Sequence, residues 1–248
     1  MMKLLIDAGN TRFHWGCYEN GHITNTQSFS YDGNETSLAD HLTNIPTPEA
    51  VLVANVAGDD LATQLNATSL SLWHITPRYI SAEKKAGLVT NGYTHTEKLG
   101  CDRWSAIVAA YHKAQSAAMV VDCGSTITVD IVDDGGQHQG GLILPGLKFM
   151  YRSLINDTAG VKSTFTLPDS GIFLGRNTHD AVNHAILSAA VEFVEHWIKV
   201  FINHYGKEAS VYLCGGDAEV IRNYLDAQVE LHPHLVLEGL VLIGAEQQ

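Results

Sequence analysis

The stretch "VVDCGSTITVD", residues 120–130, decides the fold, because an apolar run typical of a buried strand ends in a carboxylate, a glycine and two hydroxyls. The stretch "LLIDAGNTRFHWG", residues 4–16, repeats this pattern near the start of the chain. The matched positions, 115 residues apart, are Asp7 with Asp122, Gly9 with Gly124, and Thr11 with Thr126. The chain of 248 residues is long enough for one large domain or two smaller ones, and the repeat favours two.

The repeated pattern has a chemical interpretation. A glycine two residues after a strand-end aspartate lets the backbone turn tightly and leaves no β-carbon between its amides and an approaching phosphate. Asn10-Thr11 and Ser125-Thr126 add neutral donors, and an aspartate in this place can hold a hydrated magnesium ion. Two such turns facing one another would form a nucleotide clamp. Each turn could also be a plain hairpin that binds nothing, but the matched duplication favours the clamp.

Composition and charge exclude some classes of partner. The chain is 45% hydrophobic and 17% charged, and its formal net charge of −12 offers no basic footprint for nucleic acid or an anionic membrane. No apolar run reaches the roughly 18 residues that a membrane-spanning helix needs. The net charge leaves a local basic patch open as an alternative, but we expect a cytoplasmic protein with no nucleic-acid partner and no membrane partner.

Cysteine and histidine usage points away from a structural metal site. The four cysteines include no CxxC pair, which predicts reduced, buried thiols rather than a disulfide framework or a zinc site. His232 and His234 flank Pro233, an arrangement that could contact a metal or form a solvated turn.

Hydrophobic periodicity predicts an α/β protein in which a three-strand meander occurs twice. In the first half the expected elements are strands at 2–7, 12–18 and 22–29, a helix at about 35–43, a strand at 50–56, a helix at about 59–67 and a strand at 70–75. In the second half they are strands at 118–123, 127–133 and 138–144, a helix opening at Pro145, a long helix at 178–204 and a strand at 210–216. Residues 76–100 are expected to be irregular, and the predicted domains are 1–115 and 116–248.

Four motifs in this order resemble type III pantothenate kinase. They are the doubled DxGxT, "LGCDRW" at 99–104, "GGLILPGL" at 140–147 and "GRNTHDAV" at 175–182, and the resemblance runs from residue 4 to about 243. It implies two tandem ribonuclease-H-like domains of the actin, sugar-kinase and heat-shock-chaperone superfamily. It also implies ATP-dependent phosphorylation of the pantothenate hydroxyl to 4′-phosphopantothenate, the first step of coenzyme A biosynthesis. Magnesium, a monovalent cation (potassium or ammonium) and a homodimer complete what it implies.

The resemblance also implies roles for individual residues. Asp102 resembles the general base, although an aspartate here is also a good helix N-cap. Arg103 resembles a substrate-binding residue whose planar guanidinium suits the pantothenate carboxylate, the alternative being a helix-surface cation. Tyr93 and Gly100 fall where the family lines its pantothenate pocket. Thr178 resembles a threonine that reaches this pocket from the same chain or from the partner subunit, although from the residues alone it is simply a helix N-cap.

The two turns take the phosphate and cation roles by the same resemblance. The residues implied to bind ATP are Asp7, Gly9, Asn10, Thr11, Arg12, Gly124, Ser125 and Thr126. Asp122 resembles a ligand of the monovalent cation, and Gly215 and Gly216 would lie near the nucleotide or simply form a turn. The chain departs from the commoner family pattern at Ser125, which keeps a hydroxyl donor, and at Ala185, where a glycine is usual.

Two questions stay open at this level. The apolar face of the helix at 178–204 could pair two subunits or be buried in its own domain. The protein could also be a non-catalytic regulatory or accessory nucleotide-binding protein of the same fold, or another superfamily enzyme such as a sugar kinase. The intact Asp102-Arg103 pair favours an active kinase.

Overall fold

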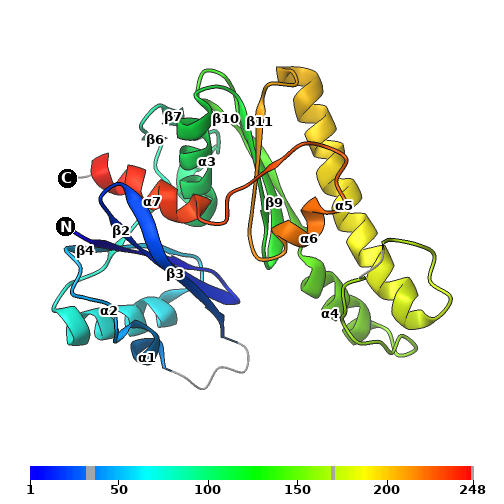
Figure 1. Ribbon diagram of the computed structural model, residues 1–248, viewed down its shortest axis with the longest axis horizontal. Coiled ribbons are helices and arrows are strands. Elements are labelled where there is room, and N and C mark those ends of the chain that lie inside the picture. Colours follow the sequence, from blue (N-terminus) through cyan, green and yellow to red (C-terminus); the bar gives the residue numbers. More distant parts are fainter. Residues whose placement is uncertain (32–36, 169–170, 247–248) are drawn as a thin grey trace. The chain divides into compact units, whose positions relative to one another are not determined.

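The first half of the chain builds a five-stranded mixed sheet (Figure 1). β1 (Lys3–Ala8), β2 (Arg12–Glu19) and β3 (His22–Ser30) pair antiparallel in chain order, which confirms the predicted meander. β4 (Ala50–Asn55) and β5 (Arg78–Tyr79) continue the sheet in parallel on the other side of β1. The resulting strand order is β3-β2-β1-β4-β5.

The second half repeats this sheet strand for strand. β8 (Ala118–Cys123), β9 (Thr126–Val132) and β10 (His138–Pro145) form the antiparallel meander. β11 (Ser210–Cys214) and β12 (Glu230–Leu231) add in parallel beyond β8. The order β10-β9-β8-β11-β12 matches the first sheet position by position, so the duplication predicted from the doubled motif extends to the whole sheet topology.

The computed structural model describes residues 1–31, 37–168 and 171–246. Contacts group Met1–Lys113 with the C-terminal segment from His234 as one unit, and Ala114–Pro233 as a second unit. The predicted division into 1–115 and 116–248 stays a prediction. The contacts add that α7 (Leu235–Glu246) packs against β1, β2 and β4, so the end of the chain returns to the N-terminal unit.

Helices cover both faces of the first sheet (Figure 1). α1 (Leu38–Leu42) and α2 (Asp59–Trp73) bury Leu42, Leu65 and Trp73 against one face, while α7 lies on the other. On that second face Gly244 of α7 meets the Leu52 side chain, and a Cβ there would lie 2.5 Å from Leu52 Cδ1. Burying apolar side chains on both faces explains why the central strands are almost wholly apolar.

Two sequence predictions for the first unit need correction. The expected strand at 70–75 is wrong, because residues 70–73 are the last turn of α2 and His74 ends that helix with a left-handed φ of 59°. Local apolar alternation suggested a strand, but the helix packing of Trp73 prevails. The helix expected at about 35–43 is the shorter α1, and residues 35–36 lie outside the described residues.

The segment between α2 and the next long helix contains only short elements, as expected for 76–100. Beyond β5 these are β6 (Lys85–Ala86), β7 (Val89–Thr90) and the 3₁₀ helix η1 (Thr96–Lys98). They lead into α3 (Cys101–Ala114), which carries the LGCDRW motif at its start. A loop with so little regular structure is a common place for binding residues.

The second unit carries α4 (Leu147–Asp157), α5 (Thr178–Tyr205) and α6 (Ala218–Arg222). α5 confirms the predicted long helix and buries Leu187, Val194 and Ile198 in the core that also holds Val121 and Val129 of its own sheet. Burial in its own unit therefore accounts for much of the apolar face. Among the described residues, no helix is long and apolar enough to cross a membrane.

Two helix starts in the second unit differ from prediction. Pro145 was expected to open a helix, but it is the last residue of β10, paired with Thr126, and Gly146 is the N-cap of α4. Thr178 was expected as an N-cap, but that position belongs to Asn177, whose side-chain oxygen accepts the Asp180 N–H at 2.9 Å.

Candidate functional site

The first of the two matched turns joins β1 to β2. Gly9 donates its N–H to the Arg12 carbonyl at 3.0 Å, and a Cβ on Gly9 would lie 3.2 Å from that oxygen. Asn10 and Arg12 are exposed, whereas Asp7 and Thr11 are half-buried. The turn therefore presents an amide, a hydroxyl and a guanidinium, which are donors suited to phosphate oxygens.

The second matched turn, between β8 and β9, is closed more tightly. Gly124 donates its N–H to the Thr126 carbonyl at 3.0 Å, and Gly146 donates its N–H to the Ser125 carbonyl at 3.0 Å. A Cβ on Gly146 would lie only 2.4 Å from the Gly124 carbonyl oxygen. Gly146 is therefore a candidate site residue that the sequence prediction missed, and the proline-glycine end of the GGLILPGL motif was its signal.

Asp122, the predicted cation ligand, lies against glycine backbone. A Cβ on Gly215 would lie 2.5 Å from Asp122 Oδ1, and one on Gly124 would lie 3.1 Å from the same oxygen. Gly215 also has a φ of +89°, a conformation that other residues rarely adopt. The carboxylate oxygen fits a hard cation that takes its other ligands from water or phosphate. In the described part of the chain, no three His, Cys, Asp or Glu side chains gather as a metal cluster.

Asp102 lies in the first turn of α3, with Gly100 before the helix rather than Asp102 at its N-cap. Asp102 Oδ1 accepts the Arg103 N–H at 2.7 Å, and a Cβ on Gly100 would lie 2.5 Å from that same oxygen. Gly100 is thus the residue that makes room for the carboxylate. This contact gives the glycine of the LGCDRW motif a steric role.

Arg103 and Tyr93 form a pair beside this carboxylate. The Arg103 guanidinium donates to the Tyr93 hydroxyl at 2.8 Å, and its central carbon lies 5.5 Å from the centre of the Tyr93 ring. Arg103 is only 8% exposed, so the alternative of a helix-surface cation is wrong. A buried guanidinium held by an aromatic hydroxyl and ring is well placed to receive a ligand carboxylate.

The Cys101 thiol links the first turn to the LGCDRW motif. Burial, together with the smaller effects of the negative charges of Asp102 and Asp7, raises the pKa of Cys101 to about 12. The Cys101 thiol also donates to the Asn55 carbonyl at 3.5 Å, at the carboxyl end of β4. Asp7 and Asp102 therefore share one neighbourhood at the carboxyl ends of the parallel strands β1 and β4, where open α/β sheets bind ligands.

Tyr31 is a second residue that the sequence prediction missed. Its N–H donates to the Thr11 carbonyl at 3.1 Å, and burial together with the Asp7 charge raises the pKa of its hydroxyl. That hydroxyl is buried and has no hydrogen-bond partner among the described residues. Only the pairing of β3 with β2 brings Tyr31 to the first turn, which explains why no local motif marks it.

Thr178 lies in the second unit, exposed, at the start of α5. It borders a groove of about 680 Å³ between α4 and α5. The lining residues are mostly apolar or small and include Met150, Leu154, Val161, Ala181, Ala185 and Ala189. Thr178 belongs to a different unit from Tyr93, Gly100, Asp102 and Arg103, so its place in a common pocket stays a prediction.

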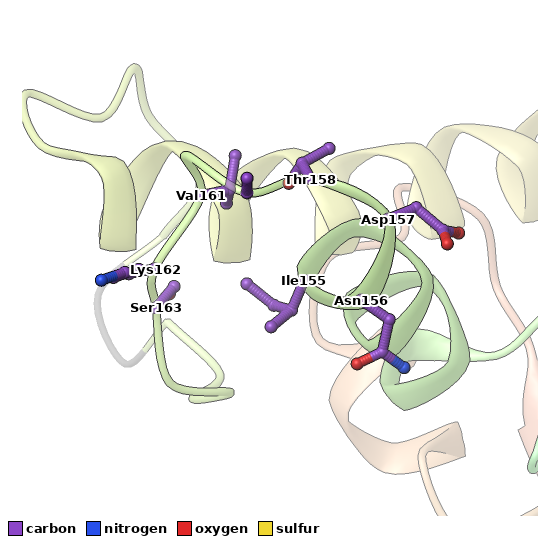
Figure 2. A pocket seen from close by; sticks show the side chains of 8 residues that line it. Ile155, Asn156, Asp157, Thr158, Val161, Lys162 and Ser163 are labelled. Atoms are coloured by element: carbon purple, nitrogen blue, oxygen red, sulfur yellow. The ribbon is translucent and has the colours of Figure 1, made fainter.

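A second hollow, of about 590 Å³, lies at the end of α4 (Figure 2). Ile155 points toward the segment that carries Lys162 and Ser163, whereas Asn156 and Asp157 point away from it. None of the predicted site residues lines this hollow.

The two histidines around Pro233 contact different parts of the chain, and a metal contact there stays a prediction. His232 Nε2 lies 3.4 Å from Glu230 Oε2, and its ring packs edge-on against Tyr212. The His234 ring instead lies 5.3 Å from the ring of His14 on β2.

Comparison with known proteins gives a consistent family. A family model described as type III pantothenate kinase matches residues 3–200. The chain is 33% identical over 246 residues to a type III pantothenate kinase of Nitrosomonas eutropha, covering 97% of this chain and 93% of that protein. It is 34% identical over 253 residues to one of Marinobacter nauticus, covering 99% and 97%.

Solved structures support the fold. A protein described as a Baf family transcriptional activator from Campylobacter jejuni superimposes with a TM-score of 0.59 at 20% identity, over 98% of both chains. Component A of the (R)-2-hydroxyglutaryl-CoA dehydratase of Acidaminococcus fermentans gives a TM-score of 0.55 at 13% identity, over 100% of both chains. Together with the duplicated sheet order, these likenesses confirm the expected fold class.

Proposed function

The chain belongs to the type III pantothenate kinase family, and on this premise we propose how its residues perform the family reaction. The enzyme phosphorylates the hydroxyl of pantothenate with ATP, the first step of coenzyme A biosynthesis. A divalent metal such as magnesium accompanies ATP in this chemistry. The residue roles below, the monovalent cation, the homodimer and a cytoplasmic location are our proposals.

Asp102 is the general base in this proposal. The pantothenate hydroxyl gives its proton to the Asp102 carboxylate as its oxygen bonds to the γ-phosphorus, and the bond from that phosphorus to the bridging oxygen of ADP breaks. The transition state is loose, so the carboxylate mainly orients the nucleophile. The position of Asp102 Oδ1 supports this role. The oxygen accepts the Arg103 N–H and lies against Gly100, and the residue adjoins the Tyr93–Arg103 pair.

The pantothenate carboxylate binds to Arg103. The guanidinium is buried and already oriented by Tyr93, so little conformational entropy is lost when a planar carboxylate accepts from it. Gly100 contributes space rather than a contact, and Thr178 contributes a hydroxyl from the start of α5.

The two turns bind the phosphates of ATP. The first would contribute Asp7, Gly9, Asn10, Thr11 and Arg12, and the second Gly124, Ser125 and Thr126. Asp122, whose Oδ1 lies against Gly215 and Gly124, would hold a monovalent cation, potassium or ammonium. Magnesium, when bound, neutralises charge on the phosphates during transfer.

The protein acts as a homodimer in this proposal, paired through the groove between α4 and α5. Ala181, Ala185 and Ala189 are exposed at four-residue spacing on α5, and small side chains at this spacing allow close approach of another helix. Light scattering on the purified protein should give the mass of a dimer, and Ala185→Glu, which places a charge in the groove, should give a monomer. A monomeric wild-type protein would contradict the proposal.

One assay tests the function. ATP-dependent phosphorylation of pantothenate is followed with purified protein, with and without potassium or ammonium, alongside Asp102→Asn. The wild-type enzyme should turn over and be stimulated by the cation, and Asp102→Asn should lower kcat by about 100- to 10,000-fold with little change in KM. Turnover that survives Asp102→Asn undiminished would remove the base assignment. No turnover by the wild type under any condition would refute the kinase.

A further inference from the structure

Asn91 links three segments around the Tyr93–Arg103 pair. Its side chain is 6% exposed and forms three hydrogen bonds to the backbone. The amide nitrogen donates to the Glu83 carbonyl at 3.2 Å and to the Thr96 carbonyl at 3.4 Å. The amide oxygen accepts the Tyr93 N–H at 2.9 Å.

The surrounding backbone needs such a link because it has little regular structure of its own. Only the two-residue strands β6 and β7 and the short η1 occur between Lys85 and Lys98. The Asn91 N–H donates to the Lys84 carbonyl at 2.9 Å, which fixes Asn91 itself at the end of β7. A side-chain oxygen that accepts the N–H two residues on forms an Asx turn, and this turn sets the direction in which Tyr93 leaves the backbone.

We propose that Asn91 is a positioning residue for the binding of the substrate carboxylate, acting through Tyr93 on Arg103. The chain of contacts is continuous: the Asn91 oxygen holds the Tyr93 N–H at 2.9 Å, and the Tyr93 hydroxyl accepts from the Arg103 guanidinium at 2.8 Å. This inference rests on the proposed function, in which Arg103 receives the pantothenate carboxylate. Asn91 itself needs no contact with the substrate.

Asparagine suits this positioning role better than aspartate or alanine would. Aspartate would keep the acceptor for the Tyr93 N–H but would lose both donors and place a negative charge beside the Glu83 and Thr96 carbonyl oxygens. Alanine would lose all three bonds and leave buried backbone groups with fewer partners. Comparing the two variants therefore distinguishes the effect of losing the turn at Tyr93 from the effect of destabilising the loop.

The test measures kcat and KM for pantothenate and for ATP in wild type, Asn91→Ala, Asn91→Asp and Tyr93→Phe, with thermal unfolding of each. Asn91→Ala should raise the KM for pantothenate by about tenfold while the KM for ATP stays within about twofold. Asn91→Asp should keep the pantothenate KM closer to wild type than Asn91→Ala does, although both lower the melting temperature. In the Tyr93→Phe background, Asn91→Ala should have a clearly smaller effect on the pantothenate KM.

Ser69→Ala is the matched control in the same unit. Ser69 is 1% exposed and its hydroxyl donates to the Ile75 carbonyl at 2.7 Å, so the variant also loses a buried hydrogen bond to backbone. It should lower the melting temperature without a selective change in the pantothenate KM.

Several outcomes would overturn the inference. They are an unchanged pantothenate KM in Asn91→Ala, equal changes in both KM values, an equal selective effect of Ser69→Ala, or full additivity with Tyr93→Phe. If Asn91→Ala does not fold, the inference would also be overturned by a pantothenate KM in Asn91→Asp that is as high as in Tyr93→Phe. A wild-type enzyme that neither binds nor phosphorylates pantothenate would instead overturn the proposed function, and this inference with it.

Discussion

The two matched turns begin alike in sequence and then diverge in structure. In the first, β1 and β2 are last paired at Ala8 and Phe13, so four residues lie between the paired positions. In the second, β8 and β9 are last paired at Cys123 and Ile127, so three residues lie between them. Correspondingly, the Gly9 N–H reaches the carbonyl three residues on, whereas the Gly124 N–H reaches the carbonyl two residues on.

The extra residue in the first turn reverses which face of the sheet the side chains of the following strand point to, compared with the matching repeat positions after the second turn. By position in the repeat, Phe13 corresponds to Thr128 and His14 to Val129. Phe13 and Val129 lie in the cores of their units, so the core positions are out of phase by one residue. His14 therefore stands opposite Asp7, while Thr128 stands opposite Asp122. The duplicated motif keeps the carboxylate and the glycine and changes the residue that faces the carboxylate.

The largest expected effect comes from changing the length of the first turn. If Asn10 is deleted and the four-residue turn is kept, Phe13 becomes part of the turn and His14 takes the place opposite Ala8, so Phe13 no longer reaches its core. Removing a fully buried phenylalanine from a core costs about 3–5 kcal/mol, so we expect loss of cooperative folding of the N-terminal unit in thermal unfolding. Deleting Gly160 from an exposed connection should cost far less. Equal melting temperatures for the two deletions would contradict the role of turn length.

The topology could be predicted from the sequence, but the difference between the turns was not. Apolar residues begin two positions after Thr11 and one position after Thr126, which is the signal for the inverted phase. The polar residues that define the repeat do not report strand register. The strand expected at 70–75 is wrong for a related reason, because local alternation does not reveal the tertiary contacts by which Trp73 belongs to a helix.

A second difference between the turns is how much backbone packs behind them, and alanine substitution tests it. A Cβ on Gly146 would lie 2.4 Å from the Gly124 carbonyl oxygen, whereas one on Gly9 would lie 3.2 Å from its nearest neighbour. We expect Gly146→Ala to lower the free energy of unfolding by about 1–3 kcal/mol and to raise the KM for ATP. Gly9→Ala should cost less than about 1 kcal/mol.

Gly160→Ala serves as the control for these two variants, because a Cβ there would meet no atom within 4 Å. Urea unfolding gives the stabilities and steady-state kinetics give the KM for ATP. If Gly9→Ala were as damaging as Gly146→Ala, the tighter packing of the second turn would have no energetic meaning.

The carboxylates of the two turns should also differ in cation dependence. In the proposed roles Asp122 holds the monovalent cation and Asp7 serves the phosphates. Asp122→Asn should raise the potassium concentration that gives half-maximal activity by about tenfold, corresponding to about 1.4 kcal/mol. Asp7→Asn should leave that concentration within about twofold while affecting the KM for ATP. Potassium titrations of initial rate give both values, and the reverse pattern would exchange the two roles.

The candidate site could be predicted only where a motif carried it. Gly100, Asp102 and Arg103 are consecutive or nearly so, and the structure gives each a contact that explains the motif. Gly146 and Tyr31 reach the turns from elsewhere in the chain, one through close backbone approach and the other through strand pairing. The GGLILPGL motif marks Gly146 without showing what it contacts, and no short stretch marks Tyr31, because both contacts depend on register and packing.

The smallest expected effect concerns pH and follows from the residue opposite each aspartate. Burial, the neighbouring His234 and Arg12 lower the pKa of His14 to about 4, and burial also lowers the pKa of His234 despite the opposing charge of Glu238. A histidine with a lowered folded-state pKa binds fewer protons when folded than when unfolded. Its stabilising contribution is therefore complete above about pH 6.5 and is lost as the pH falls from there toward 4.

Because His14 is half-buried rather than fully enclosed, we expect it to account for about 1 kcal/mol of the unfolding free energy lost between pH 7.5 and pH 5. His14→Gln should flatten the pH dependence by this amount, whereas His22→Gln, an exposed position on β3, should leave the wild-type slope. Urea unfolding at the two pH values provides the measurement. Thr128, opposite Asp122, does not titrate, so this pH dependence belongs to the first turn alone. Equal slopes for wild type and His14→Gln would show that the inverted register has no electrostatic consequence.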